Sequence, residues 1–372
     1  MWNMGCCMKI CYITDCALPW SVGGAEKRLY EISSRMKAKG HDVTTVCMKD
    51  KMHFTGERRS ILHGLKFAWQ VFNHLRKNKY DYIEAMQSPV LHIPIVWLMK
   101  GKAKFVVSWF EVWNKKVDSI SKVLGKSYPE SYWINYAGHI VGRIGMFCEW
   151  LALRLPDAII VPSEQTKQDV LASGVTKSLS VVHNGIDFQM IQKTPFKKKY
   201  DLISVGRLIR GKRVDLLIES MHALKHFKPD INAVVVGDGP EMERLKKHAK
   251  AAGVDIDFVG NVEKDSDVYR YIQSSKVAVH PSEQEGGASI SLLEFNACGI
   301  PVVSIKCPLG ISEEFFGHNN GYLAKDFDDM VRMIKVFLGD DTLRDEMRES
   351  CIEFAKGFDW SEVIKQYEKA IE

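Results

Sequence analysis

The sequence predicts an α/β protein made of two Rossmann-like, doubly wound halves, and three observations support this fold class. At 372 residues the chain is long enough for two domains, each with its own core. A strand, loop, helix and strand pattern opens the chain and starts again after a basic, proline-containing stretch at 193–199. Apolar strand-like runs alternate with helix-like segments, as expected for parallel sheets covered by helices.

The first half opens with a strand, a glycine-containing loop and an amphipathic helix. The loop ends in Gly23-Gly24-Ala25-Glu26, and the helix that follows places Leu29, Ile32 and Met36 on one face. The strands expected in this half are 8–14, 43–47, 82–85, 105–109, 158–161 and a run from 181 to the Asn184-Gly185 turn.

The second half repeats the alternation after the 193–199 stretch, which is expected to be a linker. Helices are predicted at 214–224, 241–252 and 265–274, and a short helix carries Glu294. The strands predicted here are 202–205, 233–236, 256–260, an apolar run from 277 and another after Pro301.

Composition excludes several classes of protein. With 46% hydrophobic and 26% charged residues, the chain has the composition of a soluble globular protein. Its nine cysteines form no CxxC pair and lack a histidine at metal-ligand spacing, which argues against a zinc site or a disulfide framework. No secretory signal is apparent, and no run reaches the roughly 18 apolar residues of a membrane span. We therefore expect a cytoplasmic protein, with Met8 a candidate natural start.

Charge is distributed unevenly along the chain. Residues 1–190 carry 25 basic and 16 acidic side chains, net +9, whereas the remainder carries 26 and 30, net −4. Between 49 and 104, 11 basic and 4 acidic residues are interleaved with aromatic and aliphatic ones. This pattern suits contact with anionic lipid headgroups at the inner face of a membrane. The alternative is a solvated helix face over the core, and nucleic acid is disfavoured because no nucleic-acid motif accompanies the charge.

The segment from 277 to 304 predicts an anion site. A strand is followed by the loop Glu285-Gly286-Gly287-Ala288-Ser289 and by a helix that carries Glu294. The loop has almost no side chains, so its N–H groups can approach an anion at the start of the helix. Such a turn, with a carboxylate at each end, fits a sugar nucleotide. A glycine-rich turn with one exposed and one helix-capping glutamate is the alternative.

A second anion-directed group lies in the sequence VGRLIRGKRVDLLIES. Arg207 and Lys212 follow a predicted strand and precede a predicted helix. Because ligand crevices in parallel sheets lie at the carboxyl ends of strands, both cations are expected in the crevice that the Glu285 loop enters. Two fixed cations can neutralise a diphosphate and stabilise the charge that develops on it as a leaving group, without a metal. A surface charge pair is the plainer alternative.

These motifs together resemble a known family. GRLIRGK, GDGP, the glutamate-flanked glycine loop running into ACGIPVV, the HNGID turn and the early GGAE are similar to the retaining, GT-B-fold glycosyltransferases of family 4. The resemblance covers nearly the whole chain. It implies an acceptor-side domain at 1–190, a nucleotide-sugar-binding domain at 191–355 and a closing helix at 356–372 that crosses back to the first domain, with a cleft between the domains.

The resemblance also implies roles for individual residues. Arg207 and Lys212 contact the diphosphate, Glu294 the ribose hydroxyls, and Glu285 with the loop backbone the donor sugar, which makes Arg207, Lys212 and Glu285 the catalytic set. The donor-binding residues implied are Gly24, Arg207, Lys212, Val262, Glu285, Gly286, Gly287, Ala288, Ser289, Ile290 and Glu294. No cofactor or metal is implied besides the nucleotide sugar as co-substrate.

The sequence departs from the family pattern at two places. Eight residues separate Glu285 from Glu294 instead of the usual seven, so either the loop bulges or the first role shifts. Phe110 stands where related sequences commonly carry a histidine. Either His139 or another group substitutes, or the leaving phosphate deprotonates the acceptor, or activity is altered. Phe110 and Glu111 are the acceptor-side candidates, and a core-edge carboxylate is the alternative for Glu111.

The function predicted is transfer of a hexose from a UDP- or GDP-sugar to a hydroxyl of a lipid-linked or saccharide acceptor in glycan or glycolipid assembly. A GT-B epimerase or phosphorylase is one alternative, and a nucleotide-sugar-binding protein with altered or lost transferase activity is another. An NAD-dependent oxidoreductase is disfavoured, because the loop from 15 to 26 contains Gly23-Gly24 and no GxGxxG turn.

Overall fold

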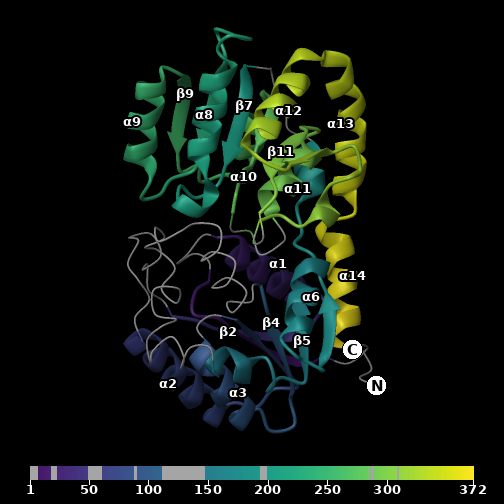
Figure 1. Cartoon of the computed structure of the whole chain (residues 1–372). Coiled ribbons are helices and arrows are strands. Elements are labelled where there is room, and N and C mark those ends of the chain that lie inside the picture. The colour runs from purple at the N-terminus through teal and green to yellow at the C-terminus, as the bar shows by residue number, and fades with distance from the viewer. Residues whose placement is uncertain are drawn as a thin grey trace. The chain divides into compact units, whose positions relative to one another are not determined.

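A computed structural model of the chain describes residues 7–17, 23–48, 61–87, 90–110, 147–192, 199–283, 285, 289–307 and 310–372. The chain divides into two compact units. The first comprises Met1–His183 with Ile364–Glu372, and the second comprises Asn184–Val363. Each unit contains a six-stranded sheet, and each is described by itself (Figure 1).

The first unit is built on a parallel sheet with the strand order β2-β1-β3-β4-β5-β6. Its strands are β1 (Lys9–Ile13), β2 (Asp42–Val46), β3 (Tyr82–Met86), β4 (Lys104–Ser108), β5 (Ala158–Val161) and β6 (Ser178–Val181). The order reverses between β1 and β3, so the loops after these two strands diverge to opposite faces of the sheet. Such a switch point is where open α/β sheets bind ligands.

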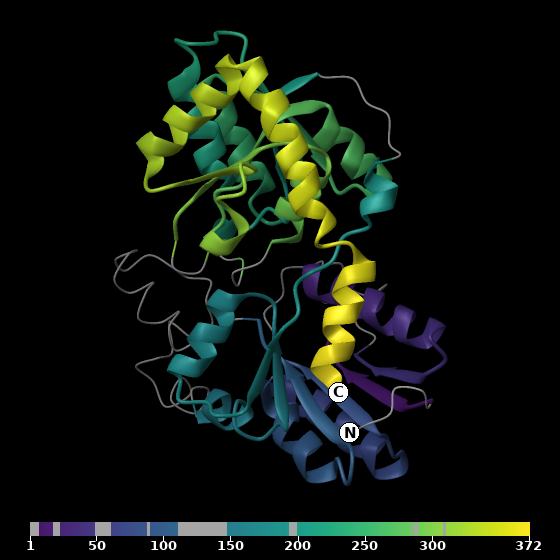
Figure 2. The same ribbon diagram turned by 90° about the vertical axis from the view of Figure 1, so that its right-hand side faces the viewer.

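Helices cover both faces of this sheet, as the alternating strand residues require. Cys11, Ile83 and Phe105 pack on one face with α2 (Ile61–Lys77) and α3 (Ile93–Met99). In both views α2 and α3 lie together on one side of the sheet, opposite α1 (Gly24–Ala38) (Figures 1 and 2). Further described helices of this unit include α6 (Glu164–Ala172), the short 3-10 helix at Val90–His92 and the helical residues 147–152.

The face that carries Tyr12 holds a buried polar cluster instead of a continuous apolar layer. The carboxylate of Glu84 accepts hydrogen bonds from the hydroxyls of Tyr82 (3.0 Å), Ser108 (2.6 Å) and Tyr367 (2.6 Å). The hydroxyls of Tyr367 and Tyr12 lie 2.9 Å apart. Burial raises the pKa of each of the three tyrosines well above its ordinary value, and the carboxylate adds to this, so the hydroxyls stay neutral donors.

The second unit has the parallel strand order β12-β11-β10-β7-β8-β9. Its strands are β7 (Tyr200–Val205), β8 (Asn232–Val236), β9 (Asp255–Gly260), β10 (Ser275–Val279), β11 (Val302–Ile305) and β12 (Gly321–Ala324). Counted within the unit, this is the Rossmann order, and its direction reverses between β7 and β10. The loops after β7 and β10 therefore border the crevice that ligands of such sheets occupy.

Two apolar layers sandwich this second sheet. One contains α8 (Val214–Leu224), α9 (Met242–Ala252) and α12 (Phe327–Gly339), with inward residues such as Leu202 and Val277. The other contains α7 (Phe188–Gln192), α10 (Asp265–Gln273), α11 (Ile290–Ala297) and α13 (Asp341–Lys356). Because strand residues alternate between these layers, the sheet is buried on both faces.

The last helix, α14 (Trp360–Ile371), begins in the second unit and ends in the first. Near its start, the Trp360 ring lies against Gly185, where an added Cβ would come within 2.5 Å of it. Near its end, Tyr367 joins the buried cluster around Glu84. The residues at 183–185 and α14 therefore connect the two units.

The two doubly wound sheets confirm the predicted fold class. Most predicted strands and helices lie within one or two residues of the observed ones. The strand expected from 181 onward is an exception, because β6 ends at Val181 and its neighbour β5 ends at Val161. The last ladder bond joins the Val182 N–H to the Val161 carbonyl, and beyond it Ile186 forms an isolated bridge with Asp359 instead of continuing β6. Of the linker expected at 193–199, residues 193–198 lie outside the described residues.

Candidate donor site at the switch point of the second sheet

Two loops meet at the switch point of the second sheet, the 206–213 loop after β7 and the loop that follows β10. The Glu283 N–H donates to the Gly211 carbonyl (2.8 Å), and the Ser282 hydroxyl donates to the same oxygen (3.2 Å). The guanidinium of Arg213 forms ion pairs with Glu283 and with Asp215. The two loops are thus tied by backbone, hydroxyl and charged contacts.

Arg213 holds a backbone conformation that side chains rarely adopt. Its φ of 49° lies in the left-handed region, and it ends the short 3-10 helix at Arg210–Lys212 immediately before α8. Strain of this kind is sustained only where surrounding contacts fix it, as the ion pairs of Arg213 do. This left-handed residue separates the 3-10 helix, which ends at Lys212, from α8, and so sets the backbone position from which the Lys212 side chain extends.

The GDGP turn after β8 packs against the 206–213 loop. The Leu208 N–H donates to the Asp238 carbonyl (2.9 Å), and the Glu241 N–H donates to the Leu208 carbonyl (3.0 Å). Gly237 has a φ of 131°, and a Cβ there would lie 2.0 Å from the Gly206 oxygen. Only glycine allows the two backbones to approach this closely.

Lys212 and Glu285, which sequence analysis assigned to one crevice, are in direct contact. The ammonium Nζ lies 2.5 Å from Glu285 Oε1, and the carboxylate side chain is 7% exposed. The Nε2 atom of His280 lies 2.8 Å from the same oxygen. Burial alone raises the pKa of Glu285, but Lys212 and His280 outweigh it and hold the pKa well below the ordinary carboxylate value. Glu285 is therefore a buried negative charge that Lys212 and His280 hold in place.

Arg207 is exposed at the start of the same loop. Within the described part of the chain, its guanidinium makes no hydrogen bond or ion pair with another side chain. The neighbouring Gly206 lies close to the Lys212 side chain, because a Cβ built on it would be 3.9 Å from Lys212 Cε. A solvated cation beside a partly buried one is a combination that can take up an anion.

The helix that follows the glycine loop starts where sequence analysis expected it. Ser289 is the N-cap of α11, and its hydroxyl accepts a hydrogen bond from the Leu292 N–H (3.4 Å). Ile290 is the first helical residue, and Glu294 is buried on the same helix. Burial raises the pKa of Tyr269, and the carboxylate of Glu294 contributes to this shift. Gly286, Gly287 and Ala288 lie outside the described residues.

The remaining predicted site residues lie on other loops. Val262 follows β9 and packs, half-buried, against the apolar layer that contains α10 and α11. In the first unit, Gly24 is the exposed first residue of α1, in the connection after β1. Phe110 is half-buried just past the end of β4, and its N–H donates to the Gln87 side-chain oxygen (2.9 Å). Glu111 lies outside the described residues.

Sequence reasoning missed two residues of this site, His280 and Arg213. A histidine that ends a buried strand was a usable signal, because a polar side chain there points to a partner at the strand end. Nothing in the sequence indicated that the backbone of Arg213 adopts a left-handed conformation. Across the described ranges, no three His, Cys, Asp or Glu side chains gather in a way that could hold a metal ion. Nor does any described helix combine the length and apolarity needed to cross a bilayer.

Two family models together match nearly the whole chain. Residues 22–189 match the model described as Glycosyltransferase Family 4, and residues 186–358 match the model described as Glycosyl transferases group 1. The second match contains the whole switch-point site, with the loops after β7 and β10.

Similar proteins point the same way. An uncharacterized glycosyltransferase of Methanocaldococcus jannaschii is 30% identical over 236 residues, which is 60% of each chain. A Campylobacter jejuni alpha-1,4-N-acetyl-D-galactosaminyltransferase, whose name includes a diNAcBac-PP-undecaprenol saccharide, is 24% identical over 94% of this chain and 95% of its own. The crystal structure of Anabaena HepE in complex with UDP-glucose superposes with a TM-score of 0.72 at 16% identity, over 97% of this chain and 98% of that one.

Proposed function

The chain belongs to the group 1 glycosyltransferases of family 4, with the GT-B fold, and from this premise we propose that it is a retaining hexosyltransferase. The donor in this proposal is a UDP- or GDP-sugar. The acceptor is a hydroxyl of a lipid-linked or other saccharide in glycan or glycolipid assembly.

The observation that carries the proposal is the charge arrangement at the β7–β10 switch point. Lys212 and exposed Arg207 lie on one loop, and the buried carboxylate of Glu285 lies on the other. In the proposed complex the two cations bind the diphosphate, and Glu285 accepts a hydrogen bond from a hydroxyl of the donor sugar. Binding of UDP-glucose by HepE, which shares the fold, supports a nucleotide sugar as the donor.

The proposed chemistry uses side chains of the protein and no metal. As the bond between the sugar carbon and the phosphate oxygen breaks, negative charge grows on the diphosphate, where Arg207 and Lys212 stabilise it. The acceptor oxygen forms its new bond with the same carbon, from the face on which the phosphate departs. The departing phosphate oxygen takes the acceptor proton, so Phe110 at the end of β4 needs no acid–base function.

A nucleotide-sugar-binding protein without transferase activity is the second candidate, and Phe110 is the observation that favours it. An epimerase or phosphorylase would share the fold. The test is a panel of UDP- and GDP-sugars, measured for thermal stabilisation, donor hydrolysis and transfer to polyprenyl-diphosphate saccharides. Transfer with retention supports the proposal. Binding without turnover for every acceptor supports the second candidate, and turnover of the donor alone supports an epimerase or a hydrolytic enzyme.

We propose further that the first unit contacts the inner, cytoplasmic face of an anionic membrane, where a lipid-linked acceptor resides. The Campylobacter relative named for an undecaprenol-linked saccharide supports this acceptor class. The contact surface, here called the α2–α3 face, exposes large apolar side chains. They are Leu62 (77% exposed), Leu65 (53%), Trp69 (65%), Trp97 (44%) and Leu98 (70%).

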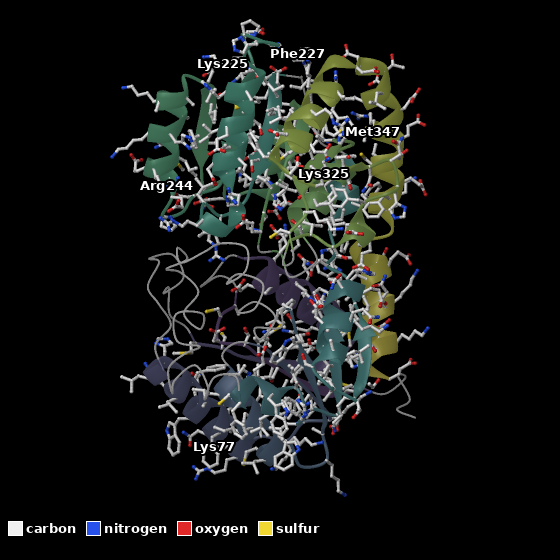
Figure 3. The ribbon with its side chains drawn as sticks, in the orientation of Figure 1. Lys77, Lys225, Phe227, Arg244, Lys325 and Met347 are labelled. Carbon is white, nitrogen blue, oxygen red and sulfur yellow. The ribbon has the colours of Figure 1, made fainter. Side chains whose placement is uncertain are left out.

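The segments that build the α2–α3 face carry only basic charges, although Lys100 is paired with Asp157 from outside them. The segments 61–80 and 90–104 contain no Asp or Glu but contain Lys66, Arg76, Lys77, Lys100 and Lys102 among their basic residues. Lys77 extends from the end of α2 at the lower edge of this unit in Figure 3. Exposed tryptophan with basic neighbours is typical of an interfacial surface, where each Lys or Arg contributes about 1 kcal/mol on an anionic bilayer.

Vesicle flotation tests the membrane contact. The wild type should float with vesicles that contain phosphatidylglycerol and should remain in solution with pure phosphatidylcholine. Trp69→Glu should abolish flotation. The matched control is Phe227→Glu, which alters a 43% exposed aromatic side chain of the second unit (Figure 3) and should float normally. Equal flotation of the Trp69 variant would refute the α2–α3 face as the contact.

A further inference from the structure

His280 is the most buried of the titratable side chains that contact Glu285, and contacts with β11 and α11 hold its backbone and ring in place. It follows β10 directly, and its ring is 3% exposed. Its N–H donates to the Val303 carbonyl (2.9 Å), and its carbonyl accepts from the Ser304 hydroxyl (2.7 Å). The ring packs edge-on against Phe295 of α11, with centroids 6.1 Å apart. Strand β11 and helix α11 thus set the direction in which the imidazole points.

One ring nitrogen of His280 serves two neighbours. Its Nε2 lies 2.8 Å from Glu285 Oε1 and 3.1 Å from the Ser289 hydroxyl. A carboxylate only accepts hydrogen bonds, so Nε2 carries the proton and donates it. Serine, histidine and glutamate also form hydrolase triads, but a triad uses both ring nitrogens, one for the serine and one for the acid. Here both contacts fall on Nε2, which rules out that relay.

Glu285 is therefore held through a single oxygen. Lys212 and His280 both reach Oε1, and across the described residues no hydrogen bond or ion pair engages Oε2. Without the imidazole, the Lys212 ammonium would be the one partner that the described residues give the carboxylate, and the carboxylate could turn both oxygens toward it. Neither oxygen of Glu285 would then be free to accept a hydrogen bond from a donor-sugar hydroxyl, while the ammonium would still have an N–H donor for phosphate.

We infer that His280 is a positioning residue that keeps Glu285 Oε2 available to a donor-sugar hydroxyl. The inference rests on the proposed donor site. It assigns His280 to recognition of the sugar rather than of the nucleotide, because its only charged contact among the described residues is the Glu285 carboxylate. It also gives Ser289 a second function besides capping α11, since its hydroxyl accepts from the same N–H.

The experiment compares nucleoside diphosphate with nucleotide sugar in each variant by calorimetry, together with kcat/KM. His280→Ala should keep its affinity for UDP or GDP within about twofold of the wild type. Its affinity for the matching nucleotide sugar and its kcat/KM should fall about tenfold to a hundredfold, the effect of losing a hydrogen bond to a charged group. His280→Gln, whose amide can donate to Glu285, should recover much of this loss.

A double variant tests whether His280 acts through Glu285. In a Glu285→Ala background, removing the imidazole should lower nucleotide-sugar affinity and kcat/KM little further, because the carboxylate that the imidazole positions is absent. Additive losses, or equal losses for UDP and the nucleotide sugar, would overturn the inference and leave His280 a structural residue. A wild type that binds no nucleotide sugar would instead refute the proposed function. Unchanged kcat/KM in His280→Ala, with donor binding intact, would overturn the positioning role alone.

Discussion

Replacing Lys212 by alanine removes the partly buried cation of the proposed diphosphate site. The ammonium has three N–H donors, and the contact with Glu285 Oε1 at 2.5 Å uses one of them. One lost charge-assisted bond to phosphate corresponds to about 1.5–3 kcal/mol, or about tenfold to a hundredfold in Kd. Because leaving-group charge is greatest in the transition state, kcat/KM should fall about a hundredfold or more.

The assay pairs titration of UDP or GDP with initial-rate transfer kinetics. Lys306→Ala is the matched control, since Lys306 forms an exposed ion pair with Glu313 in the same unit, with side chains 64% and 68% exposed. Exposed pairs of this kind contribute little, so the control should behave like the wild type. Arg207→Ala should resemble Lys212→Ala in rate. Turnover of Lys212→Ala within about twofold of the wild type would contradict the diphosphate role.

Three further predictions concern backbone fit, the buried cluster and pH. Gly237→Ala should lower nucleotide affinity and destabilise the second unit by about 2 kcal/mol or more, because its Cβ would lie 2.0 Å from a backbone oxygen. Gly317 also has a positive φ, but no atom lies within 4 Å of a Cβ built on it, so Gly317→Ala should lower the free energy of unfolding by less in denaturant titrations. Tyr367→Phe should lower the free energy of unfolding of the first unit by about 1–3 kcal/mol, whereas Tyr30→Phe, at a 52% exposed site, should not. Glu285 has a depressed folded pKa, so its stabilisation is present above the ordinary value of about 4.5 and is lost as pH falls below it. The melting-temperature difference between wild type and Glu285→Gln should therefore be largest near neutral pH and shrink in acid, and a constant difference would refute this.

Much of the fold could be predicted because its elements are short and clearly separated. The helix predicted at 214–224 matches α8, and the strand at 158–161 matches β5, because apolar periodicity and flanking turn residues coincide there. The strand β12 and the helices α12 and α13 were not predicted. β12 has four residues at the sheet edge and carries little pattern, although Asp326 as the N-cap of α12 was a usable signal.

The site could be predicted only at the level of loops. Strand order brings the Lys212 and Glu285 loops together, and motif order in the sequence was enough to expect this. The direct ion pair, the shared oxygen of Glu285 and the enclosure of His280 depend on side-chain directions across β10, β11 and α11. No local sequence pattern encodes those directions. The one-residue longer spacing between Glu285 and Glu294 stays unexplained, because the intervening glycines lie outside the described residues.

The membership of α14 in both units affects any attempt to express them separately. A cut after His183 would leave the amino-terminal fragment without Tyr367, with the hydroxyl contacts of Glu84 reduced in its interior. Burying a carboxylate with fewer donors is costly, so that fragment should fold poorly by itself. Supplying the missing segment as a peptide, or fusing residues 364–372 onto the fragment through a designed loop, should restore it. A split version of this chain should therefore be designed around its final helix instead of the unit boundary after His183.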